Sequence, residues 1–153
     1  FANLEAYLNQ AQKESDRENE HIAYHQLAYV ARSAGDFCQA LEWIEKEAAF
    51  LAKYFPDDHY RQSVNLYELG YINLKLGRLA QAQDFMQKSH IYSMESDDVV
   101  NHACSCRGLG EIAQALGNLQ AARTNFVAAI RLFDQAGDAI GKAEVEELLA
   151  SCP

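Results

Sequence analysis

The chain has little proline and few basic residues, and each shortage limits the structures or the partners that we expect. Among its 153 residues are two prolines, Pro56 and Pro153, so helices can run without interruption except at one loop. Lysine and arginine total 13 against 22 aspartates and glutamates, which gives a net charge of −9. Phosphate contacts need clustered lysine and arginine, so this balance argues against a nucleic-acid partner.

Long apolar runs and catalytic motifs are also missing. The sequence contains no stretch of eighteen apolar residues, so we predict no membrane span and no membrane partner. It shows no secretory signal, although it begins at Phe1 rather than at methionine. Nucleophile elbows, phosphate-binding glycine loops and dinucleotide fingerprints are absent, and nothing sets a nucleophile beside a base. We therefore do not expect an enzyme, and we expect no cofactor.

The cysteines and histidines do not form a recognisable metal motif. The four cysteines (Cys38, Cys104, Cys106 and Cys152) are interpreted as small apolar fillers in a reducing compartment, which favours a cytoplasmic location. Cys104 and Cys106 point about 200° apart around a helix. His21 and His25 share a helix face, but a catalytic zinc needs a third protein ligand, so we interpret both as solvent-exposed. We predict no metal site.

What the chain does have is an internal repeat. Gly35, Gly77 and Gly117 stand 42 and 40 residues apart, and each is followed five residues later by alanine. A helix commonly ends in the left-handed backbone region, which glycine enters without steric cost. Each copy is therefore interpreted as a helix, a tight turn at glycine and a second helix. Self-similarity at such a period is typical of stacked repeat proteins.

Apolar spacing and capping residues divide the chain into units. We predict a capping box from Ser15 to Glu18, and helix starts after Asp36 and Ser96–Asp98. The result is a single domain over 1–153, an all-α right-handed α-solenoid of stacked antiparallel helix pairs. Its predicted parts are a half-repeat helix (1–14), repeat 1 (16–54), repeat 2 (58–95), repeat 3 (97–135) and a closing helix (138–151). Because the chain starts inside a repeat, we expect a trimmed or partly missing N-terminus.

At these residues the chain resembles the tetratricopeptide repeat family. The third unit matches best, with Leu109-Gly110, Gly117, Ala122, Phe126 and Ala129. The second follows the pattern with Leu69-Gly70, Gly77 and Ala82, and the first is weaker, with Glu47 where a small residue is usual. The 40–42-residue period is similar to the longer-helix variants of kinesin light chains and of bacterial regulators.

The resemblance implies a peptide-binding concave surface lined by the first helix of each unit. Carried over by position, that surface comprises His25, Tyr29, Arg32, Tyr67, Tyr71, Lys75, Arg107, Glu111 and Gln114. Tyrosines would give contact area, and arginine or lysine would pair with carboxylates. The alternative is that Tyr29, Tyr67 and Tyr71 pack mainly between helices with their hydroxyls reaching solvent.

We accordingly expect a scaffold that binds a protein or a peptide. One alternative is a peptide- or ligand-sensing module of a larger, bacterial regulator. Another is a structural repeat that associates with itself, forming a homodimer through exposed helix ends such as 139–151.

Overall fold

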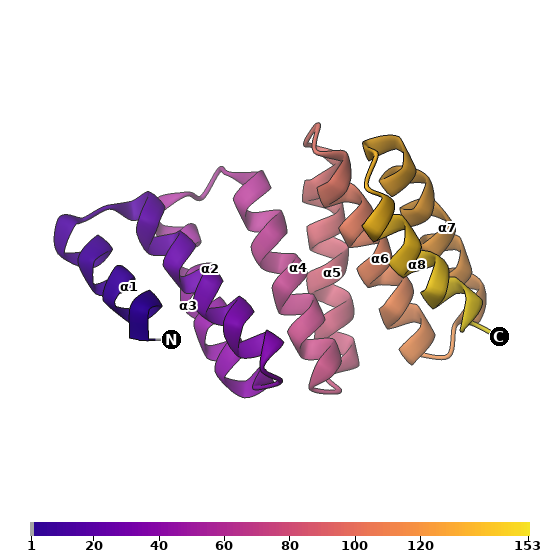
Figure 1. The fold of residues 1–153 in the computed structure, drawn as a ribbon, viewed down its shortest axis with the longest axis horizontal. Coiled ribbons are helices and arrows are strands. Elements are labelled where there is room, and N and C mark those ends of the chain that lie inside the picture. Colours follow the sequence, from indigo (N-terminus) through magenta and orange to yellow (C-terminus); the bar gives the residue numbers. More distant parts are fainter. Residues whose placement is uncertain (1) are drawn as a thin grey trace.

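The structure, a computed structural model, describes residues 2–153, and these form eight α-helices and no strand (Figure 1). Phe1, which the predicted half-repeat includes, lies outside the described residues. The helices are α1 (Ala2–Glu14), α2 (Arg17–Ser33), α3 (Phe37–Tyr54), α4 (His59–Lys75), α5 (Leu79–Met94), α6 (Val99–Ala115), α7 (Leu119–Ala136) and α8 (Ala139–Ala150).

The repeated glycines end the first helix of each pair. Gly35, Gly77 and Gly117 have φ angles of 81°, 75° and 81°, in the left-handed region where a side chain would be strained. The backbone then turns at once into the next helix, and the side chain of Asp36 accepts a hydrogen bond from the backbone N–H of Gln39 at the start of α3. The same loop chemistry thus builds three similar helix pairs.

The α-solenoid is confirmed, because each helix packs against its neighbour in sequence. The helix pairs follow one another along the long axis of the molecule, with α1 at one end and α7 and α8 at the other (Figure 1). Beyond these neighbours, α4 also contacts α6, the first helix of the next pair. Within residues 2–153, no helix combines the length and the apolar character needed to cross a membrane.

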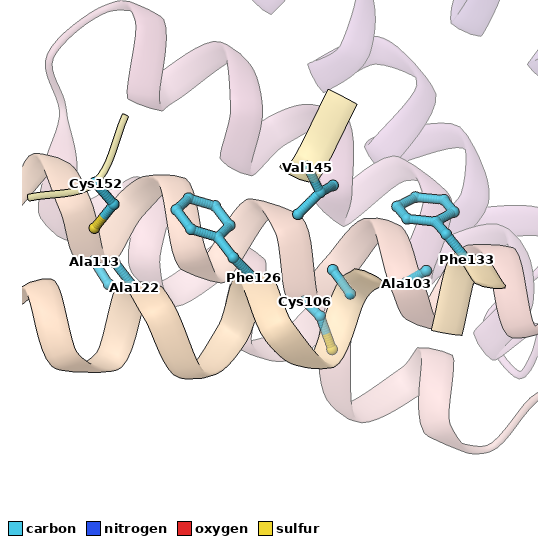
Figure 2. Close-up of a cluster of buried hydrophobic side chains, with 9 residues drawn as sticks. Ala103, Cys106, Ala113, Ala122, Phe126, Phe133, Val145 and Cys152 are labelled. Carbon is cyan, nitrogen blue, oxygen red and sulfur yellow. The ribbon is translucent and has the colours of Figure 1, made fainter. Parts of the chain in front are cut away.

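Large side chains meet small ones in the core. Figure 2 shows one cluster in which Phe126, Phe133 and Val145 lie among small residues of α6 and α7. Phe126 is fully buried, and a Cβ added to Gly110 would come within 2.5 Å of its ring. Burying such a side chain contributes about 1.5–3 kcal/mol, so the glycine allows an approach that stabilises the stack.

Two local predictions are wrong. Ser15 does not cap α2; its φ is 54°, and Asp16 is the cap, accepting from the N–H of Asn19 at 3.1 Å. The Asp16 N–H bonds to Ala11 O at 2.9 Å as a helix-ending bond, so Ser15 takes the backbone role that glycine has in the later units. Cys38 is exposed, so it is no apolar filler, whereas Cys106 and Cys152 are buried as predicted.

Candidate functional site

The predicted site residues lie on the first helices of the three pairs. We call the exposed side of α2, α4 and α6 the first-helix face. Tyr29 and Lys75 are exposed there, and the others are half-buried: His25, Arg32, Tyr67, Tyr71, Arg107, Glu111 and Gln114. Side-chain contacts divide most of these residues into separate groups.

Tyrosines and cations form the first group, which spans α2 and α4. The guanidinium carbon of Arg32 lies 4.7 Å from the ring centroid of Tyr29 and 4.8 Å from that of Tyr71. Lys75 Nζ lies 5.3 Å from the Tyr71 centroid, and the Tyr67 ring is stacked 6.5 Å from Tyr71. A cation over an aromatic face is attracted by the ring's negative quadrupole, so the group is held together electrostatically.

Arg32 is also fixed by Glu68, a residue that the sequence did not indicate. Its Nη2 donates to Glu68 Oε1 at 3.2 Å. Its Nε lies 3.0 Å from Oε2, but this second contact is an ion pair without hydrogen-bond geometry. Burial raises the pKa of Glu68 despite the opposing charge of Arg32. The pair links α2 to α4 beneath the tyrosines.

Arg107 and Glu111 neutralise each other. Arg107 Nε donates to Glu111 Oε1 at 2.8 Å, and its Nη1 donates to Glu144 of α8 at 2.5 Å. Burial alone would lower the pKa of Arg107, but the two carboxylates outweigh it and raise the pKa. A guanidinium held by two carboxylates is poorly placed to bind a third, so Arg107 fixes α8 to α6 instead of offering a free cation.

The two histidines of α2 are not solvent-exposed, and that interpretation was wrong. They converge on Glu47 of α3, which is only 2% exposed. His21 Nδ1 lies 3.3 Å from Glu47 Oε1, and His25 Nδ1 lies 3.0 Å from Oε2. Asn65 of α4 donates to the same Oε2 at 2.9 Å. We call these four residues the Glu47 cluster. A buried carboxylate needs such partners, because an unpaired one is costly.

The Glu47 cluster shifts the pKa values of its members in opposite directions. Burial alone would raise the pKa of Glu47, but the hydrogen bonds from His21, His25 and Asn65 outweigh it and hold this pKa below its ordinary range. Burial would likewise lower the pKa of His25, and the Glu47 hydrogen bond and charge raise it overall. Both shifts favour a charged pair at mildly acidic pH.

A cavity of about 240 Å³ opens between α2 and α4 above this cluster. Its lining is largely apolar and consists of His21, Ile22, His25, Gln26, Glu47, Tyr60, Arg61 and Val64. Arg61 stands at its edge, donating to Glu18 at 2.7 and 2.5 Å and pairing with Asp58. Its Nε also lies 3.3 Å from His21 Nε2, which in turn lies 3.4 Å from Glu18 Oε1, while the other ring nitrogen, Nδ1, faces Glu47.

Sequence reasoning missed the Glu47 cluster, although a signal was present. Glu47 interrupts a position that is small in the later units, where Ser89 and Ala129 stand. A carboxylate at a buried position requires donors, and the histidine pair on the preceding helix supplies them.

Comparison with known families agrees with the architecture. Residues 65–89 match the family model described as tetratricopeptide repeat. The match runs from the middle of α4 through the Gly77 turn into α5. It therefore lies in the second unit, whereas we had expected the third unit to match best. The comparison with curated proteins gave no match. The chain thus carries tetratricopeptide-like repeats in a series of eight helices within residues 2–153.

Proposed function

We propose that the first-helix face is a concave groove that binds a peptide segment of a protein partner. Tetratricopeptide repeats serve in general as protein-interaction scaffolds rather than as catalysts. The observation that carries the finer proposal is the apolar cavity between α2 and α4, which lies on the same two helices as the Arg32 tyrosine group. A preformed concavity with a few polar groups is the usual form of a binding site.

The cavity suits an apolar side chain of the peptide. Ile22 and Val64 supply apolar walls, and Tyr60 and Gln26 supply polar edges. Because both oxygens of the Glu47 carboxylate already have partners, this carboxylate does not need hydrogen bonds from a ligand. Burying a valine- or leucine-sized side chain here would contribute about 1.5–3 kcal/mol.

Lys75 suits an acidic group of the same peptide. Arg32 is engaged by Glu68, and Arg107 is engaged by Glu111 and Glu144. Lys75 is exposed, and among the described residues it takes part in no ion pair. Tyr29, which is 52% exposed, adds a rigid aromatic surface beside it on the neighbouring helix. We therefore propose an apolar anchor and a carboxylate as the recognised features.

The test is an affinity pull-down from the lysate of the native host with wild type and two variants. Tyr29→Ala/Lys75→Gln changes the exposed face only, and Ile22→Glu places a charge in the cavity. Tyr67 is left intact because it packs against the buried core of Ala82, Met86 and Ile112.

A partner that wild type retains and both variants lose would support the proposal. Arg123→Gln, on the exposed side of α7, is the matched charge control and should retain the partner. A partner retained equally by every folded variant, as judged by far-ultraviolet circular dichroism, would place the binding site elsewhere.

Self-association is the second candidate, and the closing helix favours it. Ile140 of α8 is 75% exposed, the most exposed of the large apolar residues within 2–153. Sedimentation velocity at high protein concentration would show a dimer that Ile140→Glu disrupts. A monomer in wild type would remove this candidate and leave the groove proposal unaffected.

A further inference from the structure

A group of metal-ligating side chains lies away from the first-helix face, where α5 meets α6. His90 comes from α5, and His102 and Cys106 come from α6. One ligand atom from each of the three lies within 4.8 Å of the other two. Cys106 Sγ is 4.0 Å from His90 Nδ1, and the two imidazole centroids are 5.1 Å apart.

We propose that His90, His102 and Cys106 bind a zinc ion. Two imidazoles and one thiolate form a donor set that zinc prefers, and three protein ligands leave a fourth position for water or another group. Binding forms two Zn–N bonds and one Zn–S bond, and the Cys106 thiol releases its proton to solvent.

The helical framework already places these ligands together. His102 and Cys106 are four residues apart, so they project from one face of α6 on successive turns. Figure 2 shows the Cys106 sulfur directed away from Phe126 and Val145, although the residue is buried and belongs to that core cluster. The sulfur is therefore not enclosed by the aromatic core.

One serine hydroxyl bonds the His90 ring and another bonds the His90 backbone. Ser105 Oγ donates to the His102 carbonyl at 2.9 Å, so its oxygen accepts from His90 Nδ1 at 3.0 Å. Ser93 Oγ in turn donates to the His90 carbonyl at 2.7 Å. Zinc bound through Nε2 would keep Ser105 as the hydrogen-bonding partner that metal-binding histidines usually have, and zinc bound through Nδ1 would replace this hydrogen bond.

Only a small movement of the side chains is needed for all three ligand atoms to reach one zinc ion. Tetrahedral zinc with bonds of about 2.0–2.3 Å separates its ligand atoms by roughly 3.3–3.6 Å. The present separations, up to 4.8 Å, exceed this by little more than an ångström, a distance that side-chain rotation can supply. An adjoining cavity of about 310 Å³, which Thr124, Asn125 and Ala128 of α7 also line, leaves room for the fourth ligand. Arg131 is the one other charged residue in its wall and is exposed to solvent, which screens its charge.

Such a site would join the second unit to the third. Because α5 closes one helix pair and α6 opens the next, a bound ion would fix the angle between them. The inference is independent of the peptide groove, which lies on other residues.

Cobalt titration tests the proposal directly. The full chain, reduced and free of any histidine tag, is freed of metal with a chelator and titrated with Co²⁺ as a spectroscopic substitute for zinc. We expect one equivalent to produce a thiolate-to-cobalt charge-transfer band in the near ultraviolet and visible bands of tetrahedral intensity. Zn²⁺ should then displace the cobalt and abolish both.

Substitutions then test which residues bind the metal ion. Cys106→Ala, a small change at a buried position, should abolish the charge-transfer band, and His102→Gln should weaken cobalt binding at least tenfold. Cys104→Ser, on the same helix but outside the group, and Cys38→Ser, at the exposed cysteine, should behave as wild type. The proposal is overturned if wild type shows no band or if the band persists in Cys106→Ala. Equal loss of binding in His25→Ala would also overturn it, because the ion would then lie at the Glu47 cluster.

Discussion

Replacing Glu47 with glutamine tests whether the buried cluster is a charged, pH-dependent element of stability. Glutamine keeps the shape of the side chain and removes its charge. One carboxylate oxygen becomes an NH₂ group that must face either His21 Nδ1 or the donors His25 and Asn65. Because the ionised Glu47 can only accept, His21 presents an N–H to it from Nδ1 as well, so either orientation of the amide opposes donor to donor.

The expected loss is large for a change of so few atoms. A hydrogen bond to a charged group contributes about 1.5–3 kcal/mol, and a buried donor left without an acceptor costs about 1–3 kcal/mol. We expect Glu47→Gln to lower the free energy of unfolding by about 3 kcal/mol at pH 5.5. A domain of this kind is stable by about 5–15 kcal/mol in total, so the variant should fold but with clearly reduced stability.

The loss should depend on pH in a defined direction. The pKa of His25 is raised above its ordinary value of 6.5, so its contribution is full below pH 6.5 and is lost as pH rises through the raised pKa. The pKa of Glu47 is lowered below its ordinary 4.5, so its contribution is full above that value and is lost as pH falls through the lowered pKa. The difference between wild type and variant should therefore be greatest between about pH 4.5 and 6.5, and should fall to about 2 kcal/mol at pH 8, where the histidines are neutral and only hydrogen bonds from uncharged donors to the ionised Glu47 remain.

Urea unfolding followed by far-ultraviolet circular dichroism at pH 5.5, 7 and 8 measures this difference. At pH 5.5 the transition midpoint should shift by roughly 1–3 M, given slopes of about 1–3 kcal/mol per molar urea. Glu45→Gln, an exposed change on the same helix, should stay within about 0.5 kcal/mol at every pH. A loss for Glu47→Gln that is constant with pH, or larger at pH 8 than at pH 5.5, would refute the charged pair.

Three further substitutions test the packing and the helix starts. Gly110→Ala places a Cβ 2.5 Å from the buried ring of Phe126 and should lower the free energy of unfolding by about 1–3 kcal/mol in urea titration. Gly70→Ala meets the flexible end of Met86 at 2.9 Å and should cost less; equal losses would show that side-chain flexibility does not decide the outcome. Arg78 begins α5 without a side-chain cap, so Arg78→Asp should raise the melting temperature through a gain of about 0.5–1 kcal/mol, and a lower melting temperature would contradict this.

The helices could be predicted from the sequence because their determinants are local. Repeat 2, predicted to start at 58, begins with α4 (His59–Lys75), which lies between the Asp58 cap and the Gly77 turn. Capping residues and apolar spacing act within one or two helical turns, so both can be recognised in the sequence alone. Ser15 misled the prediction because it adopts a left-handed conformation that serine rarely takes, and the cap moved by one residue to Asp16.

The polar groups could not be predicted because they join residues on different helices. Glu47 reaches His21 across 26 positions and Asn65 across 18, and both contacts depend on how α2, α3 and α4 pack. Helical periodicity shows that His21 and His25 share a face, but not which neighbour covers it. His90 likewise meets Cys106 only because α5 lies against α6.

One buried position that is equivalent in the three units carries a different residue in each. Glu47, Ser89 and Ala129 occupy the same buried position in successive units. Ser89 needs only the Ser63 carbonyl, to which it donates at 2.7 Å, and Ala129 needs no polar partner, so the stacking geometry does not require a carboxylate there. Where the fold does not require a buried charge, we expect neighbouring polar groups to pair with it and the position to belong to a functional site. In this chain those polar groups, two histidines and Asn65, stand directly below the cavity between α2 and α4, which is why we locate peptide recognition at the junction of the first two units.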